Sequence, residues 1–348
     1  MGHCRIAQRL PRLWYRRQLA VALLPLLPFS WLFRLIVWAR YTLYRCGVLR
    51  SYRLSVPVIV IGNLTVGGSG KTPLAIWLVE RLSELGWRPG IISRGYGGAV
   101  DGVQAVAADS DASVVGDEPL LLARRVNVPV FVGRDRVAAG QALLDNHPEC
   151  NVIVSDDGLQ HYRLQRAVEI AVFDGRGAGN ARLLPAGPLR EPLQRLAAVS
   201  AVVRSATPLA QKEDATRGVP HFEMRLVGQR FYLLTDAQHS CSADDLQGKR
   251  LYAMAGIGDP SRFFRQLEAL GLEFEARPFP DHHIYRAADL AFAHDGVVLM
   301  TEKDAVKCAA LVAGVAWVLP VEAQVISASA DHSLLDIILE KIDGRALA

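Results

Sequence analysis

The stretch 58–79, VIVIGNLTVGGSGKTPLAIWLV, constrains the fold of this chain more than any other part of it. Val58–Ile61 is a β-branched apolar run, which is typical of a strand buried on both faces. From Lys71 onward the sequence favours a helix with Pro73 in its first turn. The glycine-rich turn between them would direct backbone N–H groups at the helix N-terminus, where the helix dipole also favours an anion. This arrangement predicts a loop that binds the phosphates of a nucleoside triphosphate.

Single positions of this phosphate loop (P-loop) predict particular contacts. Lys71 is expected to reach the β- and γ-phosphates, and the Thr72 hydroxyl is expected to ligate Mg²⁺. The usual pattern begins with a glycine where this chain has Thr65, so the strict motif fails at one residue. A glycine-rich turn without a ligand is the alternative. The predicted phosphate-binding residues are Thr65, Val66, Gly67, Gly68, Ser69, Gly70, Lys71 and Thr72.

The charge of the chain is concentrated at its N-terminal end. Residues 1–53 contain ten arginines and no Asp or Glu, and because the whole chain carries +4, the remainder carries −6. An acidic body argues against a nucleic-acid groove spread over the fold. The five cysteines have no CxxC spacing, which disfavours a disulfide framework or a zinc site and fits a reducing compartment.

The same N-terminal segment predicts a contact with a membrane. Leu19–Phe33 is strongly apolar, but Pro25 and Pro28 interrupt it and Arg34 ends it, so it is shorter than the roughly 20 residues that a spanning helix needs. Aromatic residues alternate with the arginines, as is typical of a membrane interface. We expect an interfacial anchor on the cytoplasmic face of a membrane. A single span and a helical hairpin packed on the body are the alternatives, and a signal peptide is disfavoured because no convincing cleavage site follows.

The pattern from Val58 to Val203 repeats strand, loop and helix, which predicts an α/β fold: a P-loop-containing parallel sheet with helices on both faces. A polar stretch at 206–220 predicts a boundary, followed by a shorter αβ pattern. We therefore expect an N-terminal membrane-associated segment (1–53), a nucleotide-binding domain (54–205) and a smaller C-terminal α/β domain (206–348). The last strand and helix of that third part could pack back on the nucleotide-binding domain.

Two pairs of adjacent carboxylates are candidates for Mg²⁺ binding and proton transfer. Asp156 and Asp157 follow the apolar strand at 151–155, the position of the second Mg²⁺-binding element in phosphate-loop folds. An Asx-rich turn is the alternative. Asp117 and Glu118 could hold Mg²⁺ and accept a proton, or they could simply be first-turn acids on a helix dipole.

Further polar groups occur at predicted turns. His282 and His283, in FPDHH, fit a hydrogen-bonding or acid–base role better than a zinc site, although an exposed pair without a role is the alternative. The TEKD turn after the strand at 297–300 is similar to purine-base readers, in which Asp304 would accept from the base and the stem of Lys303 would lie across it. Arg94, in SRGYGG, could contact a ligand or be a solvated charge.

Nine motifs occur together in one order: IGNLTVGGSGKTP, SRGYGG, GDEP, GRDR, DDGLQH, LLPAGPLREP, AGIGDP, FPDHH and TEKD. In this combination the chain, from about residue 10 to 310, resembles the tetraacyldisaccharide 4′-kinases of Gram-negative bacteria. Thr65 is a feature of that family's own loop. The resemblance implies ATP- and Mg²⁺-dependent transfer of a phosphoryl group to the 4′-hydroxyl of tetraacyldisaccharide 1-phosphate, forming lipid IVA in lipid A biosynthesis. It also implies two domains with ATP between them, and an N-terminal helix in contact with inner-membrane lipid.

The resemblance also implies roles for particular residues. Asp117 would be the general base and His282 its orienting partner, with His283 as the other candidate for that role. The implied metal ligands are Thr72, Glu118, Asp156 and Asp157. The implied substrate or phosphate contacts are Arg94, Arg134, Arg136, Gln160 and Arg190.

Two other classes of protein share part of these features. A phosphate-loop switch or metallochaperone-type NTPase would have the same loop and carboxylates, but it would act on a protein partner and would not need a lipid-facing segment. A membrane-anchored scaffold that binds nucleotide without turnover would leave Asp117 and His282 unexplained. No obligate protein partner and no nucleic acid is expected.

Overall fold

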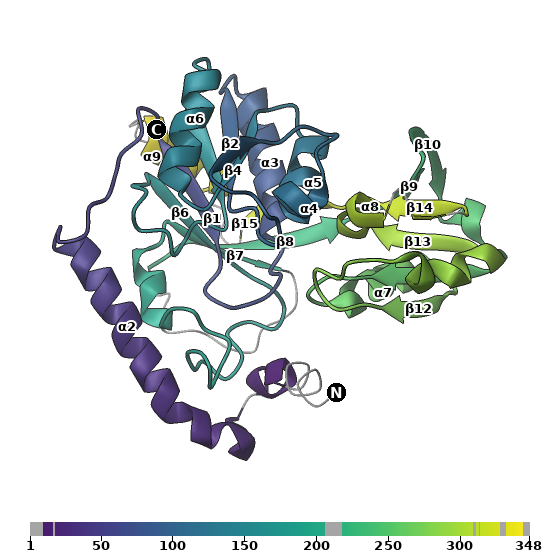
Figure 1. Cartoon of the computed structure of the whole chain (residues 1–348), viewed down its shortest axis with the longest axis horizontal. Helices are drawn as coiled ribbons and strands as arrows, with labels where there is room; N and C mark the ends of the chain where they lie inside the picture. The colour runs from purple at the N-terminus through teal and green to yellow at the C-terminus, as the bar shows by residue number, and fades with distance from the viewer. Residues whose placement is uncertain are drawn as a thin grey trace.

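The computed structural model describes residues 10–16, 18–205, 218–308, 311–312, 314–327 and 332–343. Two β-sheets lie side by side, each with its own helices, and one long helix runs along the outer side of the larger domain (Figure 1). The N-terminal helix and the smaller sheet are on different sides of the large sheet (Figure 1).

The larger sheet has nine strands in the order β15-β8-β7-β6-β1-β5-β2-β4-β3. Its central strands are parallel, and the two edge strands β3 and β15 are antiparallel to their neighbours. The strands are β1 (Val58–Gly62), β2 (Pro89–Ser93), β3 (Val103–Ala105), β4 (Val130–Gly133), β5 (Val152–Asp156), β6 (Val168–Phe173), β7 (Ala201–Ser205), β8 (His221–Val227) and β15 (Glu322–Ser327). Strands β1, β2, β4, β5 and β6 are buried along their whole length, as expected for a parallel sheet covered on both faces.

Helices cover both faces of this sheet, so the predicted α/β architecture is confirmed. On one face α3 (Lys71–Glu84), α5 (Asp117–Arg125) and α9 (Leu334–Asp343) bury apolar side chains against the strands. On the other face α6 (Arg136–Asn146) packs on β2 and β4 through residues such as Leu143. The short helix α4 (Ala112–Val115) precedes α5.

The smaller sheet has six strands in the order β10-β9-β14-β13-β11-β12. They are β9 (Arg230–Leu233), β10 (Asp236–Ser242), β11 (Leu251–Ala255), β12 (Glu275–Pro278), β13 (Val297–Thr301) and β14 (Ala316–Leu319). Helix α7 (Pro260–Ala269) packs in the apolar cluster on one face, and α8 (Glu302–Cys308) packs in the cluster on the other.

The limits of the two domains differ from the predicted boundary at residue 206. Strand β8 pairs in parallel with β7 and therefore belongs to the larger sheet. The chain returns to that sheet with β15, which pairs antiparallel to β8, and with α9, which contacts β6. The smaller domain is thus an insertion between β8 and β15, and both connections between the domains pass through these two adjacent strands (Figure 1).

The N-terminal helix is longer than the sequence predicted. A 3₁₀ turn, η1 (Val21–Leu26), continues directly into α2 (Leu27–Arg45). Pro28 lies in the first turn of α2, where its missing N–H costs nothing, and the helix continues past Arg34. In the described part of the chain, Val21–Arg45 is the one helix long and apolar enough to cross a membrane, with a mean hydropathy of 1.8.

One face of α2 packs on the body and the other is exposed. The Ser30 hydroxyl donates a hydrogen bond to the Leu183 carbonyl oxygen (2.8 Å), and the Tyr41 ring lies 5.4 Å from the Tyr162 ring. The outward face exposes large apolar side chains: Phe29, Trp31, Leu32, Leu35, Ile36 and Trp38. Ordinary packing on the body therefore accounts for only one side of this helix.

Candidate active site

The phosphate loop has the backbone conformation that its glycines predict. Gly70 caps α3 in the left-handed region (φ +85°), and Gly67 has φ +98°. A side chain at either position would be strained, which explains the glycines. Gly68 faces Gly258 of the smaller domain so closely that a Cβ atom on Gly258 would lie 2.9 Å from the Gly68 nitrogen.

Thr65 replaces the usual glycine because the loop begins in an extended conformation. Thr65 forms an antiparallel bridge with Leu189, and the Val66 N–H donates to the Pro188 carbonyl oxygen (2.9 Å). On the other side the Arg190 N–H donates to the Leu64 carbonyl oxygen (2.6 Å). The LLPAGPLREP segment thus holds the start of the loop as a short strand pair, a conformation that does not require glycine.

Lys71 lies between two acceptors at the carboxyl ends of β1 and β5. Its Nζ atom is 3.5 Å from the Asn63 Oδ1 atom and 3.5 Å from the Asp157 Oδ1 atom. Asp157 also pairs with Arg190 (3.4 Å). Burial raises the pKa of Asp157, but the charges of Lys71 and Arg190 outweigh this effect and hold it below its ordinary value. Asp157 is therefore ionised and engaged with two cations.

Asp156 has the opposite environment. Its side chain is fully buried, and neither of its oxygens has a hydrogen-bond partner among the described residues. Burial, followed by the charge of Glu118, raises its pKa to about 7. Buried carboxylate oxygens without partners are hard ligands available to a divalent cation. Of the two aspartates, Asp156 fits Mg²⁺ better than Asp157.

The described residues contain no group of three His, Cys, Asp or Glu side chains arranged to hold a metal. Mg²⁺ does not require such a group, because it usually takes only one or two protein carboxylates and completes its shell with water and substrate phosphates. Thr72 and Glu118 line the cavity next to the phosphate loop and offer further oxygen donors.

A second cluster joins the two domains. Asp117, at the start of α5, lies with its Oδ2 atom 3.1 Å from the Nδ1 atom of His282. Lys303 of α8 contacts Glu118 (Nζ to Oε1, 3.0 Å), Asp281 (Oδ1, 3.2 Å) and Asp117 (Oδ2, 3.7 Å). Two carboxylates of the larger domain thus meet a histidine and a lysine of the smaller one.

These contacts shift the pKa values of the cluster in consistent directions. Burial raises the pKa of Asp117, but the hydrogen bond to His282 and the charge of Lys303 together lower it by more than burial raises it. The pKa of Asp117 therefore lies below its ordinary value. The hydrogen bond to Asp117 raises the pKa of His282 despite partial burial and the nearby Lys303. Burial lowers the pKa of Lys303, but Glu118, Asp281 and Asp117 raise it more. Asp117 is therefore an anion with a cationic Lys303 beside it.

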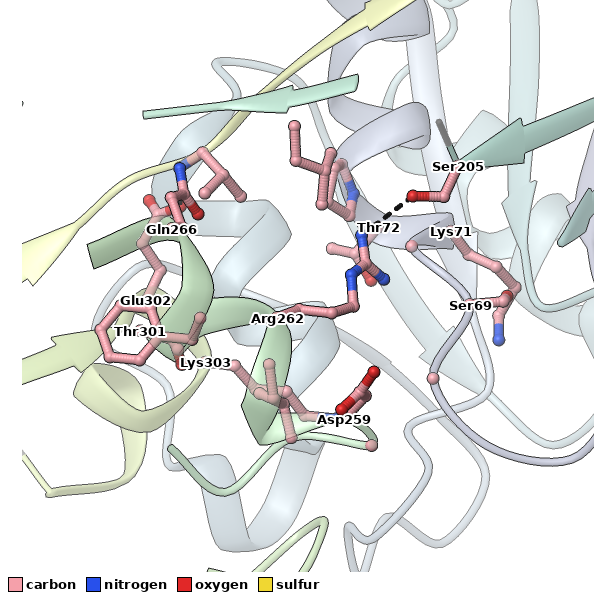
Figure 2. Close-up of a pocket in the computed structure, with 18 of the residues that line it drawn as sticks. Ser69, Lys71, Thr72, Ser205, Asp259, Arg262, Gln266, Thr301, Glu302 and Lys303 are labelled. Carbon is pink, nitrogen blue, oxygen red and sulfur yellow. Dashed lines mark hydrogen bonds between the residues drawn. The ribbon is translucent and has the colours of Figure 1, made fainter. Parts of the chain in front are cut away.

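A cavity of about 760 Å³ lies between the domains, bounded by the phosphate loop on one side and by α7 and the TEKD turn on the other. Figure 2 shows Lys71 and Ser69 across this space from Asp259, Arg262 and Lys303. Arg262 donates a hydrogen bond to the Ser205 hydroxyl (3.3 Å) and so crosses from one domain to the other (Figure 2). The volume suits a nucleotide-sized ligand.

Comparison with known proteins identifies the family of this chain. The family model described as tetraacyldisaccharide-1-P 4′-kinase matches residues 22–342. The chain belongs to the tetraacyldisaccharide 4′-kinase family. The tetraacyldisaccharide 4′-kinase of Dechloromonas aromatica (strain RCB) is 54% identical over 345 residues, which cover 99% of this chain and 100% of the relative. The tetraacyldisaccharide 4′-kinase of Azoarcus sp. (strain BH72) is 54% identical over 322 residues, which cover 92% of this chain and 93% of the relative. A crystal structure of LpxK from Aquifex aeolicus in complex with ATP matches with a TM-score of 0.77 and 32% identity, covering 92% of this chain and 100% of that one.

Within this kinase fold, the structure separates the two histidines of FPDHH. His282 contacts Asp117, whereas the Nε2 atom of His283 lies 3.1 Å from Asp289 Oδ2. The His283 ring packs against Phe279 and Tyr285, with ring centroids 4.9 Å away in both cases. Of the two histidines, His282 is therefore the one that contacts Asp117.

The predicted arginine contacts occupy different environments. Arg190 pairs with Asp157 beside the phosphate loop, and Gln160 donates to Glu191 (2.9 Å) and to the Asn63 carbonyl oxygen (3.0 Å). Arg136 is buried, and its guanidinium donates to the carbonyl oxygens of Arg134 and Asp157. Arg136 thus holds the Asp157 turn in place, while Arg94 and Arg134 are exposed and free to contact a ligand.

The interpretation of the TEKD turn as a base reader does not fit the geometry. Asp304 is fully buried and accepts hydrogen bonds from the Gly256 N–H, the Tyr285 hydroxyl (2.7 Å) and the Thr301 hydroxyl (2.6 Å). It has no accessible acceptor for a base. Lys303 is directed to the carboxylates around Asp117.

Three site residues received no role from the sequence. Asn63 bonds Lys71 (3.5 Å) and, through its amide, the Gly67 carbonyl oxygen (3.1 Å). Asp281 is the third carboxylate on Lys303, and Arg176 donates to the Gly68 carbonyl oxygen (3.2 Å). Asn63 and Asp281 lie inside motifs that the sequence already singled out, but only the folded chain shows what they contact.

Proposed function

We propose that this protein transfers the γ-phosphoryl group of ATP to the 4′-hydroxyl of tetraacyldisaccharide 1-phosphate, forming lipid IVA in lipid A biosynthesis. The observation that carries this proposal is the Asp117–His282 pair (3.1 Å), joined by Lys303 to Glu118 at the edge of the cavity that the phosphate loop bounds. Membership of the family, and the ATP present in the related crystal structure, support the same reaction.

In this proposal the ATP phosphates lie on the backbone N–H groups of the phosphate loop and on the N-terminus of α3. Lys71 contacts the β- and γ-phosphates, and Asn63 and Asp157 hold its ammonium group in position. Thr72, Glu118 and Asp156 would hold Mg²⁺, which neutralises phosphate charge during transfer. Phosphoryl transfer needs little more from the protein than this positioning and charge neutralisation.

Asp117 accepts the proton of the sugar hydroxyl as the new P–O bond forms. The lowered pKa of Asp117 keeps its carboxylate ionised at neutral pH. In a loose transition state the sugar hydroxyl needs to lose its proton only late in the reaction. His282 fixes the orientation of the carboxylate and, with its raised pKa, can share the transferred proton.

The site is complete only when the domains are in contact. Asp117 and Glu118 belong to the larger domain, whereas His282 and Lys303 belong to the insertion between β8 and β15. Separation of the domains would remove the His282 hydrogen bond and leave the carboxylates without their cation. Closure of the cavity therefore also brings His282 and Lys303 into contact with the two carboxylates.

We also propose that α2 lies on the cytoplasmic face of the inner membrane. Its outward face exposes Phe29, Trp31 and Trp38, which suits the headgroup region, and its inward face packs on the body. The acyl chains of the acceptor could then stay in the bilayer while the sugar enters the site. In this proposal the enzyme is peripheral and α2 does not span the bilayer.

Acceptor-dependent ATP consumption tests the proposal against the switch and scaffold classes. We expect ATP turnover to depend strongly on a detergent-dispersed disaccharide monophosphate and to produce a bisphosphorylated lipid. Turnover that is unaffected by the acceptor would support a switch NTPase, and ATP binding without turnover under both conditions would support a scaffold.

A further inference from the structure

A second, smaller cavity of about 280 Å³ lies where the C-terminal half of α2 meets the body. We call it the tyrosine–arginine pocket and define it by Tyr44, Arg45, Tyr162, Arg166 and Arg195, which are among its lining residues. It shares no lining residue with the nucleotide cavity. Nothing in the proposed reaction uses it.

The pocket contains hydrogen-bond donors without partners. The Tyr162 side chain is about nine-tenths buried, with 9% of its surface exposed, and its hydroxyl has no hydrogen-bond partner among the described residues. The Nε atoms of Arg166 and Arg195 are also buried without partners. Because a buried donor without a partner is costly, three of them beside one cavity indicate a ligand with acceptor atoms.

The pocket is also positively charged. The guanidinium carbons of Arg40, Arg166 and Arg195 lie 5.7, 5.8 and 6.0 Å from the centroid of the Tyr162 ring. Glu169 is the acidic residue in the lining, and it is already paired with Arg166 (3.1 Å) and Arg195 (2.6 Å). Arg45 forms no ion pair with any residue that the structure describes. The excess of donors and cations favours an oxyanion.

We propose that the tyrosine–arginine pocket binds the phosphate group of an anionic phospholipid of the membrane. The pocket is lined by residues of the same helix whose outward face exposes Trp31, Leu35 and Trp38, so the acyl chains of a lipid bound there would lie along that apolar face. Guanidinium groups and a tyrosine hydroxyl are suited to a phosphodiester at the interface. This inference rests on the proposed membrane contact of α2 but not on the proposed reaction.

Vesicle co-sedimentation of the full chain tests the pocket. The vesicles are phosphatidylcholine alone or phosphatidylcholine with phosphatidylglycerol, and the variants are Tyr162→Phe and Arg45→Gln. Tyr162→Phe is decisive because it changes no charge and removes a hydroxyl that no described residue bonds. We expect it to weaken binding to the phosphatidylglycerol vesicles by roughly threefold or more, with no change on phosphatidylcholine and no fall in the thermal midpoint.

Arg34→Gln is the matched control for Arg45→Gln, since it removes the same charge from an exposed position of the same helix outside the pocket. We expect Arg45→Gln to weaken binding to phosphatidylglycerol vesicles at least about threefold more than Arg34→Gln does. Equal effects of the two arginine variants, together with an inert Tyr162→Phe, would show general surface attraction and overturn the pocket.

Inorganic phosphate separates a lipid headgroup from a soluble ligand. The phosphate loop also binds phosphate, so the informative quantity is the difference in phosphate affinity between wild type and Tyr162→Phe. A loss of phosphate affinity in Tyr162→Phe with unchanged vesicle binding would overturn the lipid assignment. Failure of the wild type to bind either vesicle would overturn the membrane contact, whereas phosphoryl transfer in detergent would still test the reaction.

Discussion

The Nδ1 atom of His282 lies 3.1 Å from the Oδ2 atom of Asp117, although the two residues are 165 positions apart in the chain and belong to different domains. The backbone of His282 has φ +56°, a left-handed conformation that is costly for a residue other than glycine. Asp281 and Tyr96 flank the ring, with the Tyr96 ring centroid 5.0 Å away. The fold therefore holds this histidine against the carboxylate at some cost in backbone strain.

Replacement of Asp117 by Asn should lower kcat by about 10² or more, because general-base catalysis contributes about 10²–10⁴. The affinity for ATP should change little, since Asp117 contacts His282 and Lys303 and not the phosphate loop. Single-turnover transfer and equilibrium ATP binding measure the two quantities separately. His283→Ala is the matched control: His283 bonds Asp289, so its loss should leave kcat within a few-fold of wild type, about the range expected away from catalytic groups.

The pKa of His282 provides a readout that does not depend on activity. Its hydrogen bond to Asp117 is the largest contribution that raises this pKa above the ordinary value of 6.5, while burial and Lys303 lower it. Asp117→Asn should therefore lower the pKa of His282, as measured by the NMR titration of its ring protons. The sign of the linkage follows: the contribution of protonated His282 to stability is present below pH 6.5 and lost as the pH rises through the folded-state pKa. An unchanged pKa in Asp117→Asn would show that the 3.1 Å contact is not formed in solution.

Lys303 should act by holding three carboxylates together across the domain interface. Lys303→Met removes the cation that pairs with Glu118, Asp281 and Asp117, so the pKa of Asp117 should rise and the acid limb of the pH–rate profile should move to higher pH. We expect kcat/KM to fall by about tenfold or more, as for loss of a buried charge-assisted contact. Lys303→Arg should restore part of the rate, and Lys341→Met, which removes an exposed lysine of α9, should have no effect. If kcat/KM of Lys303→Arg is no higher than that of Lys303→Met, Lys303 has a steric role instead.

Asp156 should destabilise the protein when no metal is bound. Its pKa, raised to about 7 chiefly by burial, means that the folded state disfavours the charged form, so stability falls as the pH rises from 3.8 towards 7. In chelator at pH 8, the free energy of unfolding of Asp156→Asn should exceed that of wild type by about 1 kcal/mol or more. Wild type should gain thermal stability from Mg²⁺ with ATP, whereas Asp156→Asn should gain little. Equal stabilisation of both proteins by Mg²⁺ would remove Asp156 from the metal site.

The local elements could be predicted from the sequence because their signals are local. The run Val58–Ile61 and the glycines before Lys71 specify a buried strand, a turn and a helix within one stretch of chain. The strand, the turn and the helix therefore needed no knowledge of distant contacts. The adjacency of Asp156 to the phosphate loop, in contrast, depends on β5 pairing in parallel with β1, which brings the carboxyl ends of both strands to one edge.

The remaining features depend on contacts between distant residues. Strand β15 returns to the larger sheet by pairing with β8, almost a hundred residues earlier in the chain, for example Ala323 with Leu226. The TEKD turn had the composition of a ligand site, but Gly256 and Tyr285 occupy the oxygens of Asp304, and Glu118, 185 positions away, binds Lys303. Composition alone cannot distinguish a polar residue that awaits a ligand from one that the fold already satisfies.

The most direct test of the account is transfer of label from γ-labelled ATP to a detergent-dispersed disaccharide monophosphate, with the lipid products separated by chromatography. We predict a labelled bisphosphorylated lipid with wild type, its loss in Lys71→Ala, and a decrease of about 10² or more in Asp117→Asn under saturating ATP. Release of labelled phosphate without a labelled lipid, with the acceptor dispersed and ATP bound, would contradict the account and favour an NTPase that acts on another partner.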